Sequence, residues 1–173
     1  MGMLLELAKG IDVATERVGQ AVKWLVLLAA LISAVNAGLR YGLGIGSNAG
    51  IELQWYLFGG IFLLGSGYTL KHRGHVRIDL LHGRLSPRAQ ALVEMLGTLF
   101  FLMPFCLLMV DLSWPIFVQA WQTGEMSPDA GGLPRWPVKL LVPAGFALLA
   151  LQGVAEFIKA AVVFRQSGAG DQS

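Results

Sequence analysis

The chain has 173 residues, of which 55% are hydrophobic and 14% are charged, and its net charge at pH 7 is +2. Soluble domains carry about 25% charged residues, and a chain this short cannot enclose several long apolar helices inside other protein. The composition therefore excludes an ordinary soluble domain and predicts an all-α integral membrane protein.

The first 20 residues predict a short amphipathic helix that lies in the membrane interface. Apolar residues recur at helical spacing from Leu4 to Val18, and charged residues take much of the remaining surface. The alternative is a frayed, partly helical N-terminus. A cleaved signal peptide is not favoured, because Glu6, Asp12 and Glu16 precede the first apolar run.

Four membrane spans are predicted in one domain, residues 21–165. Each span contains an apolar run free of Asp, Glu, Lys and Arg. A helix needs about 20 mostly apolar residues to cross about 30 Å of hydrocarbon, and the flanks of each run complete that length. The expected spans are about 21–40, 51–70, 89–118 and 138–164. The polar end of the chain, residues 166–173, is expected to be disordered.

The basic residues predict the orientation of these spans. Ten of the 13 Lys and Arg residues lie before the first span, between the second and third spans, or near the end of the fourth. Connections rich in Lys and Arg stay in the cytoplasm, so both termini are expected to be cytoplasmic. Because these residues lie beside spans, their charge indicates topology and not a surface for nucleic acid.

Few side chains are suited to redox or metal chemistry. Cys106 is the only cysteine, so no disulfide or thiol relay can form within the chain. All three histidines lie in the connection 71–88, whereas a haem would need histidines inside the spans. His75, Asp79 and His82 share a helical spacing there, but the many neighbouring basic residues disfavour a metal. No cofactor or metal site is therefore predicted.

Acidic residues within spans are the first candidates for function in a membrane protein. Besides Glu52, which starts the second span, the candidates are Glu94, Asp111 and Glu156. None of the four falls clearly at the middle of the membrane, and Lys159 follows Glu156 at the pairing distance i+3. No phosphate-binding loop, nucleophile motif or zinc-protease helix is present. The sequence predicts a subunit that braces a larger partner and is not an enzyme.

Two alternatives from other classes remain open. One is a small autonomous transporter that works as a homodimer and uses the carboxylates named above. The other is the membrane anchor of an electron-transfer enzyme, which would hold a haem or a quinone.

Two stretches resemble the small membrane subunit, the DctQ-type subunit, of tripartite ATP-independent periplasmic (TRAP) transporters. The first runs from Glu52 to Gln90 and includes ELQW and HVRIDLL; the second runs from Gly131 to Lys159 and begins GGLPRWP. With SNAGIELQW at Ser47–Trp55, the chain resembles the branch for mannitol and chloroaromatic compounds, which is related to systems for 2-oxo acids. The similarity covers roughly residues 20–165.

The resemblance implies a division of labour among three proteins. A periplasmic solute-binding protein captures the solute, and a large membrane subunit carries the sodium and substrate sites and moves as an elevator. The small subunit packs against the static scaffold of the large one in the bacterial inner membrane, in contact with lipid. The resemblance therefore implies no catalytic, metal, cofactor or substrate site in this chain.

Eight motif residues are candidates for contact with the partner subunit or for anchoring in the interface. They are Glu52, Gln54, Trp55, Arg77, Asp79, Pro134, Arg135 and Trp136. The first three begin the second span. The next two form a cytoplasmic ion pair or bind lipid phosphate, unless they lie in a solvated loop. The last three form a stiff outer turn that either supports docking of the binding protein or simply belongs to the aromatic belt.

Overall fold

The computed structural model describes residues 2–72 and 85–169, and these residues are almost entirely helical. The helices are α1 (Gly2–Leu43), α2 (Asn48–Lys71), α4 (Pro87–Gly97), η1 (Thr98–Leu102), α5 (Met103–Thr123) and α6 (Trp136–Ala169). Within the described ranges the only β-type pairing is an isolated bridge between Met126 and Pro134. The predicted all-α class is therefore confirmed.

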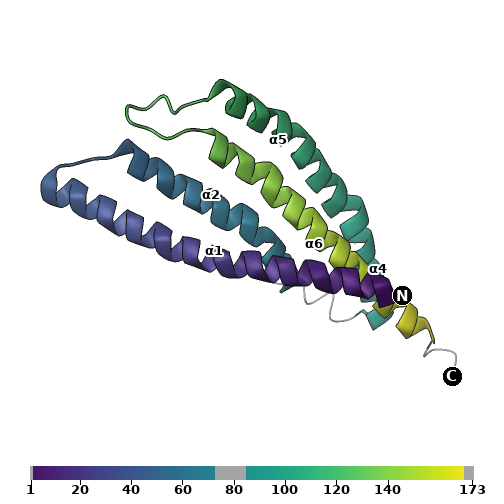
Figure 1. The fold of residues 1–173 in the computed structure, drawn as a ribbon. Coiled ribbons are helices and arrows are strands. Elements are labelled where there is room, and N and C mark those ends of the chain that lie inside the picture. Colours follow the sequence, from purple (N-terminus) through teal and green to yellow (C-terminus); the bar gives the residue numbers. More distant parts are fainter. Residues whose placement is uncertain (1, 73–84, 170–173) are drawn as a thin grey trace.

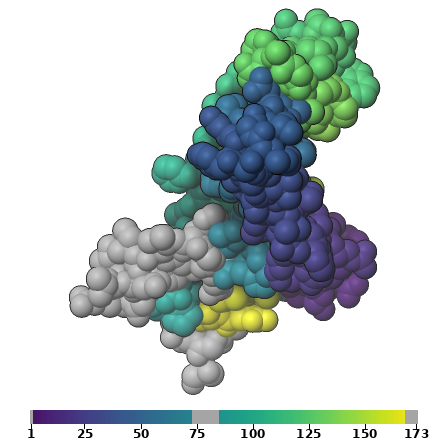
Figure 2. All heavy atoms as spheres, turned by 90° about the vertical axis from the view of Figure 1, so that its left-hand side faces the viewer, coloured from purple at the N-terminus to yellow at the C-terminus, as the bar shows by residue number. Residues whose placement is uncertain are grey.

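The long helices lie side by side in the order α1, α2, α6, α5, and they spread like a fan (Figure 1). The two connections α1–α2 and α5–α6 lie at the wide end, and the start of α1 and the end of α6 lie at the narrow end. Figure 2 views the molecule from the wide end, with the α1–α2 connection in blue and the α5–α6 loop in green. Helix α6 is central, because it contacts α1, α2, α4 and α5.

Three helical segments are long and apolar enough to cross a membrane: Gly2–Leu43, Pro87–Thr123 and Trp136–Ser167. This count applies to the described residues. Helix α2, which contains Glu52, Gln54 and several glycines, is not among the three.

The N-terminal segment is helical, as predicted, but it is not a separate helix. Helix α1 continues without a break from Gly2 through the first span to Leu43. No proline interrupts this segment, and its glycines weaken a helix without ending it. Gly19 also faces the ring of Tyr68, so the junction packs against α2 where a break was expected.

The C-terminal prediction needs a correction. Residues 166–169 were expected to be disordered, but they form the last turn of α6. The helical repeat of the fourth span simply continues to Ala169, because no proline follows Pro143. Residues 170–173 lie outside the described part of the chain.

A π-helical turn separates α4 from α5. The N–H of Met103 bonds to the carbonyl of Thr98, five residues earlier. Pro104 follows directly, and it has no N–H to offer to the carbonyl of Phe100. The wider turn accommodates this missing bond, so the third span bends without interruption.

Small residues bring α6 close to α2. A Cβ atom placed on Gly145 would lie 2.6 Å from Cβ of Leu63 and 2.9 Å from its carbonyl oxygen. Gly67 on α2 faces the carbonyl of Leu148 and the side chain of Gln152 in the same way. Close backbone approach of this kind stabilises helix pairs in membranes, where lipid removes most of the hydrophobic driving force.

Candidate functional site

Polar side chains gather in two clusters, one at each end of the helix bundle. The outer cluster centres on Glu52, which is 1% exposed in the first turns of α2. Its carboxylate accepts hydrogen bonds from the backbone N–H of Leu133, at 2.7 Å, and from the hydroxyl of Ser127. The guanidinium of Arg135 lies 3.6 Å from the same carboxylate and also donates to Ser127. A buried carboxylate is therefore both paired and hydrogen-bonded.

The α5–α6 loop folds back as a small hairpin onto this carboxylate. Gly124 ends α5 with φ 59°, a conformation that glycine adopts without strain. The backbone of Ser127 then bonds to Leu133, and that of Arg135 bonds to Glu125. The loop is thus held by its own backbone hydrogen bonds and by the bonds to Glu52, which attach it to the start of α2.

Further hydrogen bonds attach the loop to α2. The hydroxyl of Tyr56 donates to the carbonyl of Pro134 at 2.9 Å, and the side-chain amide of Asn48 donates to the carbonyl of Ala130 at 3.1 Å. Nearer the start of α6, Lys139 forms an ion pair with Glu125. We name Glu52, Ser127, Leu133 and Arg135 the outer cluster.

The structure places the other predicted residues in different settings. Gln54 accepts a 2.9 Å hydrogen bond from Ser33 of α1, so its amide is used within the chain. The side chain of Trp55 is 59% exposed and points away from the bundle. Trp136 packs edge-on against Trp121, with ring centroids 4.6 Å apart, and links α6 to α5.

Two of the eight candidates, Arg77 and Asp79, lie outside the described residues, as do His75 and His82. Within the described ranges, no group of three or more His, Cys, Asp and Glu side chains is placed to hold a metal ion. Cys106 is buried in α5, and Asp111 is exposed on the same helix.

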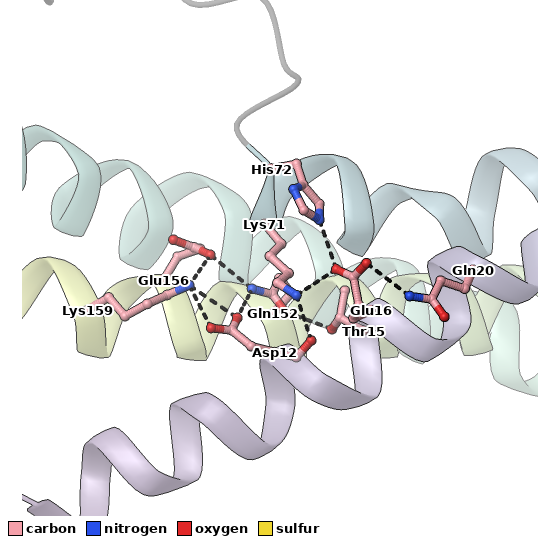
Figure 3. Close-up of polar contacts among 9 residues, drawn as sticks. All are labelled: Asp12, Thr15, Glu16, Gln20, Lys71, His72, Gln152, Glu156 and Lys159. Carbon is pink, nitrogen blue, oxygen red and sulfur yellow. Dashed lines mark hydrogen bonds and ion pairs between the residues drawn. The ribbon is translucent and has the colours of Figure 1, made fainter. Parts of the chain in front are cut away.

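The inner cluster joins α1, α2 and α6 at the other end of the bundle (Figure 3). Its centre is Gln152, a fully buried residue of α6. The hydroxyl of Thr15 donates to the amide oxygen of Gln152 at 2.7 Å. The amide nitrogen of Gln152 donates to Asp12 at 2.8 Å and to Glu156 at 2.9 Å. Every polar group of this buried side chain is thus engaged.

Ion pairs surround this buried amide. Lys159 lies 3.1 Å from Asp12 and 2.6 Å from Glu156, so the predicted pair between Glu156 and Lys159 is confirmed. On the α2 side, Lys71 lies 2.7 Å from Glu16 and also donates to the backbone carbonyl of Asp12. We name these residues the inner cluster: Asp12, Thr15, Glu16, Lys71, His72, Gln152, Glu156 and Lys159.

Glu16 is held in its charged form by its neighbours. Hydrogen bonds from Lys71 and then from His72 hold its pKa at about 2, below the ordinary value of 4.5. Glu16 precedes the predicted first span, and its side chain is part-exposed. The nitrogen Nε2 of His72 lies 2.9 Å from the carboxylate, and the imidazole ring lies tilted against the ring of Tyr68, with centroids 4.3 Å apart.

Asp12, Thr15 and Gln152 were not predicted, although the sequence contains a signal for them. Asp12, Thr15 and Glu16 lie three and four residues apart on α1 and therefore share one face. Gln152, Glu156 and Lys159 do the same on α6. Two polar faces in an otherwise apolar chain are expected to meet, since an unpaired polar group in hydrocarbon is costly.

Two cavities adjoin the inner cluster. One, of about 200 Å³, lies between α2, α4 and α6 and is lined in part by Lys71, Glu94 and Lys159. The other, of about 250 Å³, is lined in part by Glu94, Glu156 and Thr98 of the π-turn. Two of the carboxylates considered from the sequence, Glu94 and Glu156, thus line cavities beside the inner cluster.

Comparison with known proteins identifies the chain's relatives. The family model for the DctQ component of tripartite ATP-independent periplasmic transporters matches residues 29–162. A C4-dicarboxylate TRAP transporter small permease protein, DctQ, of Pseudomonas aeruginosa is 28% identical over 117 residues, which cover 66% of this chain and 54% of that protein. A putative TRAP transporter small permease protein of Haemophilus influenzae is 30% identical over 112 residues, 65% of this chain and 67% of that protein.

The match spans about half the length of the Pseudomonas protein and two thirds of the Haemophilus protein. No solved structure matches the chain. The family is a transporter component and not an enzyme, and the long apolar helices fit a multi-pass protein of the inner membrane. Since the family model covers most of the chain, this protein belongs to the DctQ component family of tripartite ATP-independent periplasmic transporters.

Proposed function

We propose that this chain is the small permease subunit that braces the large elevator subunit of a sodium-driven TRAP transporter. The main support is the way that the two polar clusters tie the helices together at both ends. The two clusters hold the buried polar side chains Glu52, Thr15 and Gln152, and many large apolar side chains of the long helices are exposed. A helix bundle tied at both ends, with a largely apolar exterior, suits a scaffold in the membrane.

The spacing of the clusters supports four spans. Glu52 and Lys71, at the two ends of α2, are 19 positions apart, about 28 Å of helix rise. Lys139 and Lys159 on α6 are 20 positions apart, about 30 Å. Both values match the roughly 30 Å hydrocarbon core. We therefore assign a membrane crossing to helix α2 as well, packed against α1 and α6.

The narrow end of the fan, which holds the start of α1 and the end of α6, is assigned to the cytoplasm. Two serines that cap helices provide a matched test, because both are exposed: Ser47 is the N-cap of α2, and Ser86 is the N-cap of α4 and is assigned to the opposite side of the membrane. In a Cys106→Ala background, Ser47→Cys should react with a membrane-impermeant maleimide in cells with a permeable outer membrane. Ser86→Cys should react only after lysis. Equal labelling of both positions would overturn the four-span topology.

The partners follow from the family. We assign the sodium and substrate sites to a large TRAP membrane subunit and the capture of solute to a periplasmic binding protein. The solute is proposed to be an organic acid or a related compound of the branch for mannitol, chloroaromatic compounds and 2-oxo acids. The Pseudomonas relative named for C4-dicarboxylates fits the broader class of organic acids.

Co-purification and reconstitution test the proposal. The chain should form a stable one-to-one complex with the large subunit of the same system. In liposomes that complex should take up solute only with the binding protein and an inward sodium gradient. If the chain instead purifies as a homodimer and moves solute alone, the scaffold role is wrong, and Glu94 and Glu156 beside the inner cavities become the candidate transport carboxylates.

A further inference from the structure

An apolar groove lies between the beginning of α1 and the end of α6. It has a volume of about 140 Å³ and is lined by Leu4, Phe157, Ile158, Ala161, Val162 and Arg165. Leu4 is 52% exposed, and the side chain of Arg165 is exposed. In Figure 1 the purple start of α1 and the yellow end of α6 lie together at the narrow end of the fan, away from the two loops.

The groove lies just beyond the inner cluster. Arg165 follows Lys159 by six positions, about 9 Å of helix rise. If the inner cluster marks the edge of the hydrocarbon core, the basic end of the groove lies at the depth of the lipid headgroups. An open apolar groove at that depth would meet water unless something with both an apolar and a polar part covered it.

The charge of Arg165 indicates which molecule this is. No residue in the described part of the chain forms an ion pair or hydrogen bond with its guanidinium. Guanidinium groups bind phosphate oxygens through two parallel hydrogen bonds. Leu4 lies in the first turn of α1, where backbone N–H groups have no partner within the helix and favour an anion.

We propose that this groove binds one anionic phospholipid. The phosphate lies on the guanidinium of Arg165, and a segment of one acyl chain lies along Leu4, Phe157 and Val162. A zwitterionic headgroup would leave the charge of Arg165 unbalanced, so a lipid with a net negative charge is preferred. The site belongs to this chain alone and does not depend on the transporter role proposed above.

The test uses the full chain purified in a mild non-ionic detergent. Phosphatidylglycerol and phosphatidylcholine are titrated separately, and the lipid retained per chain is counted by native mass spectrometry. The unaltered protein should retain phosphatidylglycerol about fivefold more tightly than phosphatidylcholine, as expected for one basic residue near a phosphate. Arg165→Gln should abolish this preference and keep the same unfolding temperature.

Two further variants make the result specific. Arg40→Gln removes an exposed arginine from α1 at the other end of the molecule, and it should leave the preference intact. Ala161→Phe fills the groove but keeps Arg165, and it should also lower retention of phosphatidylglycerol. Loss of the preference in Arg40→Gln, or its persistence in both groove variants, would overturn the proposal.

A protein occupant would give a different result. In that case Arg165→Gln would leave lipid retention unchanged but weaken co-purification with the large subunit. The groove would then be a subunit contact, and the lipid site proposed here would be wrong.

Discussion

The hydroxyl of Thr15 donates a 2.7 Å hydrogen bond to the amide oxygen of Gln152, 137 positions later in the chain, and the contact is buried. The same amide reaches Asp12 and Glu156 through its nitrogen. One side chain of α6 therefore fixes both the rotation and the depth of α1. Together with the ion pair between Asp12 and Lys159, this hydrogen-bonded group specifies how the two helices fit together.

Replacing Gln152 by leucine should loosen α1 from α6. Gln152→Leu keeps the volume of the side chain but leaves the hydroxyl of Thr15 without its acceptor in a buried place. An unsatisfied buried donor costs about 1–3 kcal/mol, and polar pairs in membranes tend toward the lower end. The free energy of unfolding, measured by titration with a denaturing detergent, should fall by about that amount.

The matched control for this variant is Gln166→Leu, which changes an exposed glutamine on the same helix. It should change the free energy of unfolding by less than about 0.5 kcal/mol. A double variant with Thr15→Val should lose less than the sum of the two single losses, because both remove the same bond. Strict additivity would show that the two side chains do not interact.

The close approach of α6 to α2 should make Gly145 intolerant of a methyl group. In Gly145→Ala the new Cβ would meet the backbone of Leu63, which cannot move without shifting α2. Overpacking of this kind costs about 1–3 kcal/mol. Gly97→Ala in α4 is the control, since a Cβ there meets nothing within 4 Å.

The two glycine variants should differ in the sign of their effect. Gly97→Ala should raise the unfolding temperature, because alanine favours a helix by about 1 kcal/mol over glycine. Gly145→Ala should lower it despite the same gain. If both variants raise it, α2 and α6 are not packed as closely as the structure shows.

The three helical segments that are long and apolar enough to cross a membrane were predictable, because charged residues mark the ends of apolar runs. The fourth predicted span, on α2, stays a prediction. The pair Glu156–Lys159 was predictable as well, since it depends only on the helical repeat. The pairs Glu52–Arg135 and Thr15–Gln152 were not, because they depend on which helices are neighbours and how each is rotated. The continuity of α1 across residue 20 has the same origin, since packing of Gly19 against Tyr68 is a tertiary contact.

The stability supplied by Glu16 should depend on pH in acid. Its folded-state pKa, about 2, is depressed below the ordinary 4.5 by Lys71 and His72. The contribution is therefore fully present above about pH 4.5 and is lost as the pH falls toward about 2, where the folded form takes up the proton. Glu16→Gln should lower the unfolding temperature at pH 7, and its deficit relative to the unaltered protein should shrink steadily between pH 4.5 and 2.5.

The control for the pH series is Glu6→Gln, which alters an exposed carboxylate earlier on α1. Its unfolding curve should follow that of the unaltered protein at every pH. A deficit in Glu16→Gln that stays constant down to pH 2.5 would contradict the ion pair with Lys71 as the source of the stability.

The outer loop should lose its fixed shape when Glu52 loses its charge. Glu52→Gln keeps the size of the side chain, but its amide nitrogen cannot accept a hydrogen bond, and the guanidinium of Arg135 loses its counter-charge. One of the donors, Ser127 or the backbone of Leu133, is then left without an acceptor. We expect the loop to open more often and a glutamate-specific protease to cleave after Glu125 several times faster than in the unaltered protein.

The control is Gln122→Glu, which would add a cleavage site at an exposed position of α5. Cleavage there should have the same rate with Glu52 and with Gln at position 52, because the helix does not depend on Glu52. A rate after Glu125 that is unchanged in Glu52→Gln would show that the hairpin holds its shape through its own backbone bonds, and that the buried carboxylate is not what fixes the loop on α2.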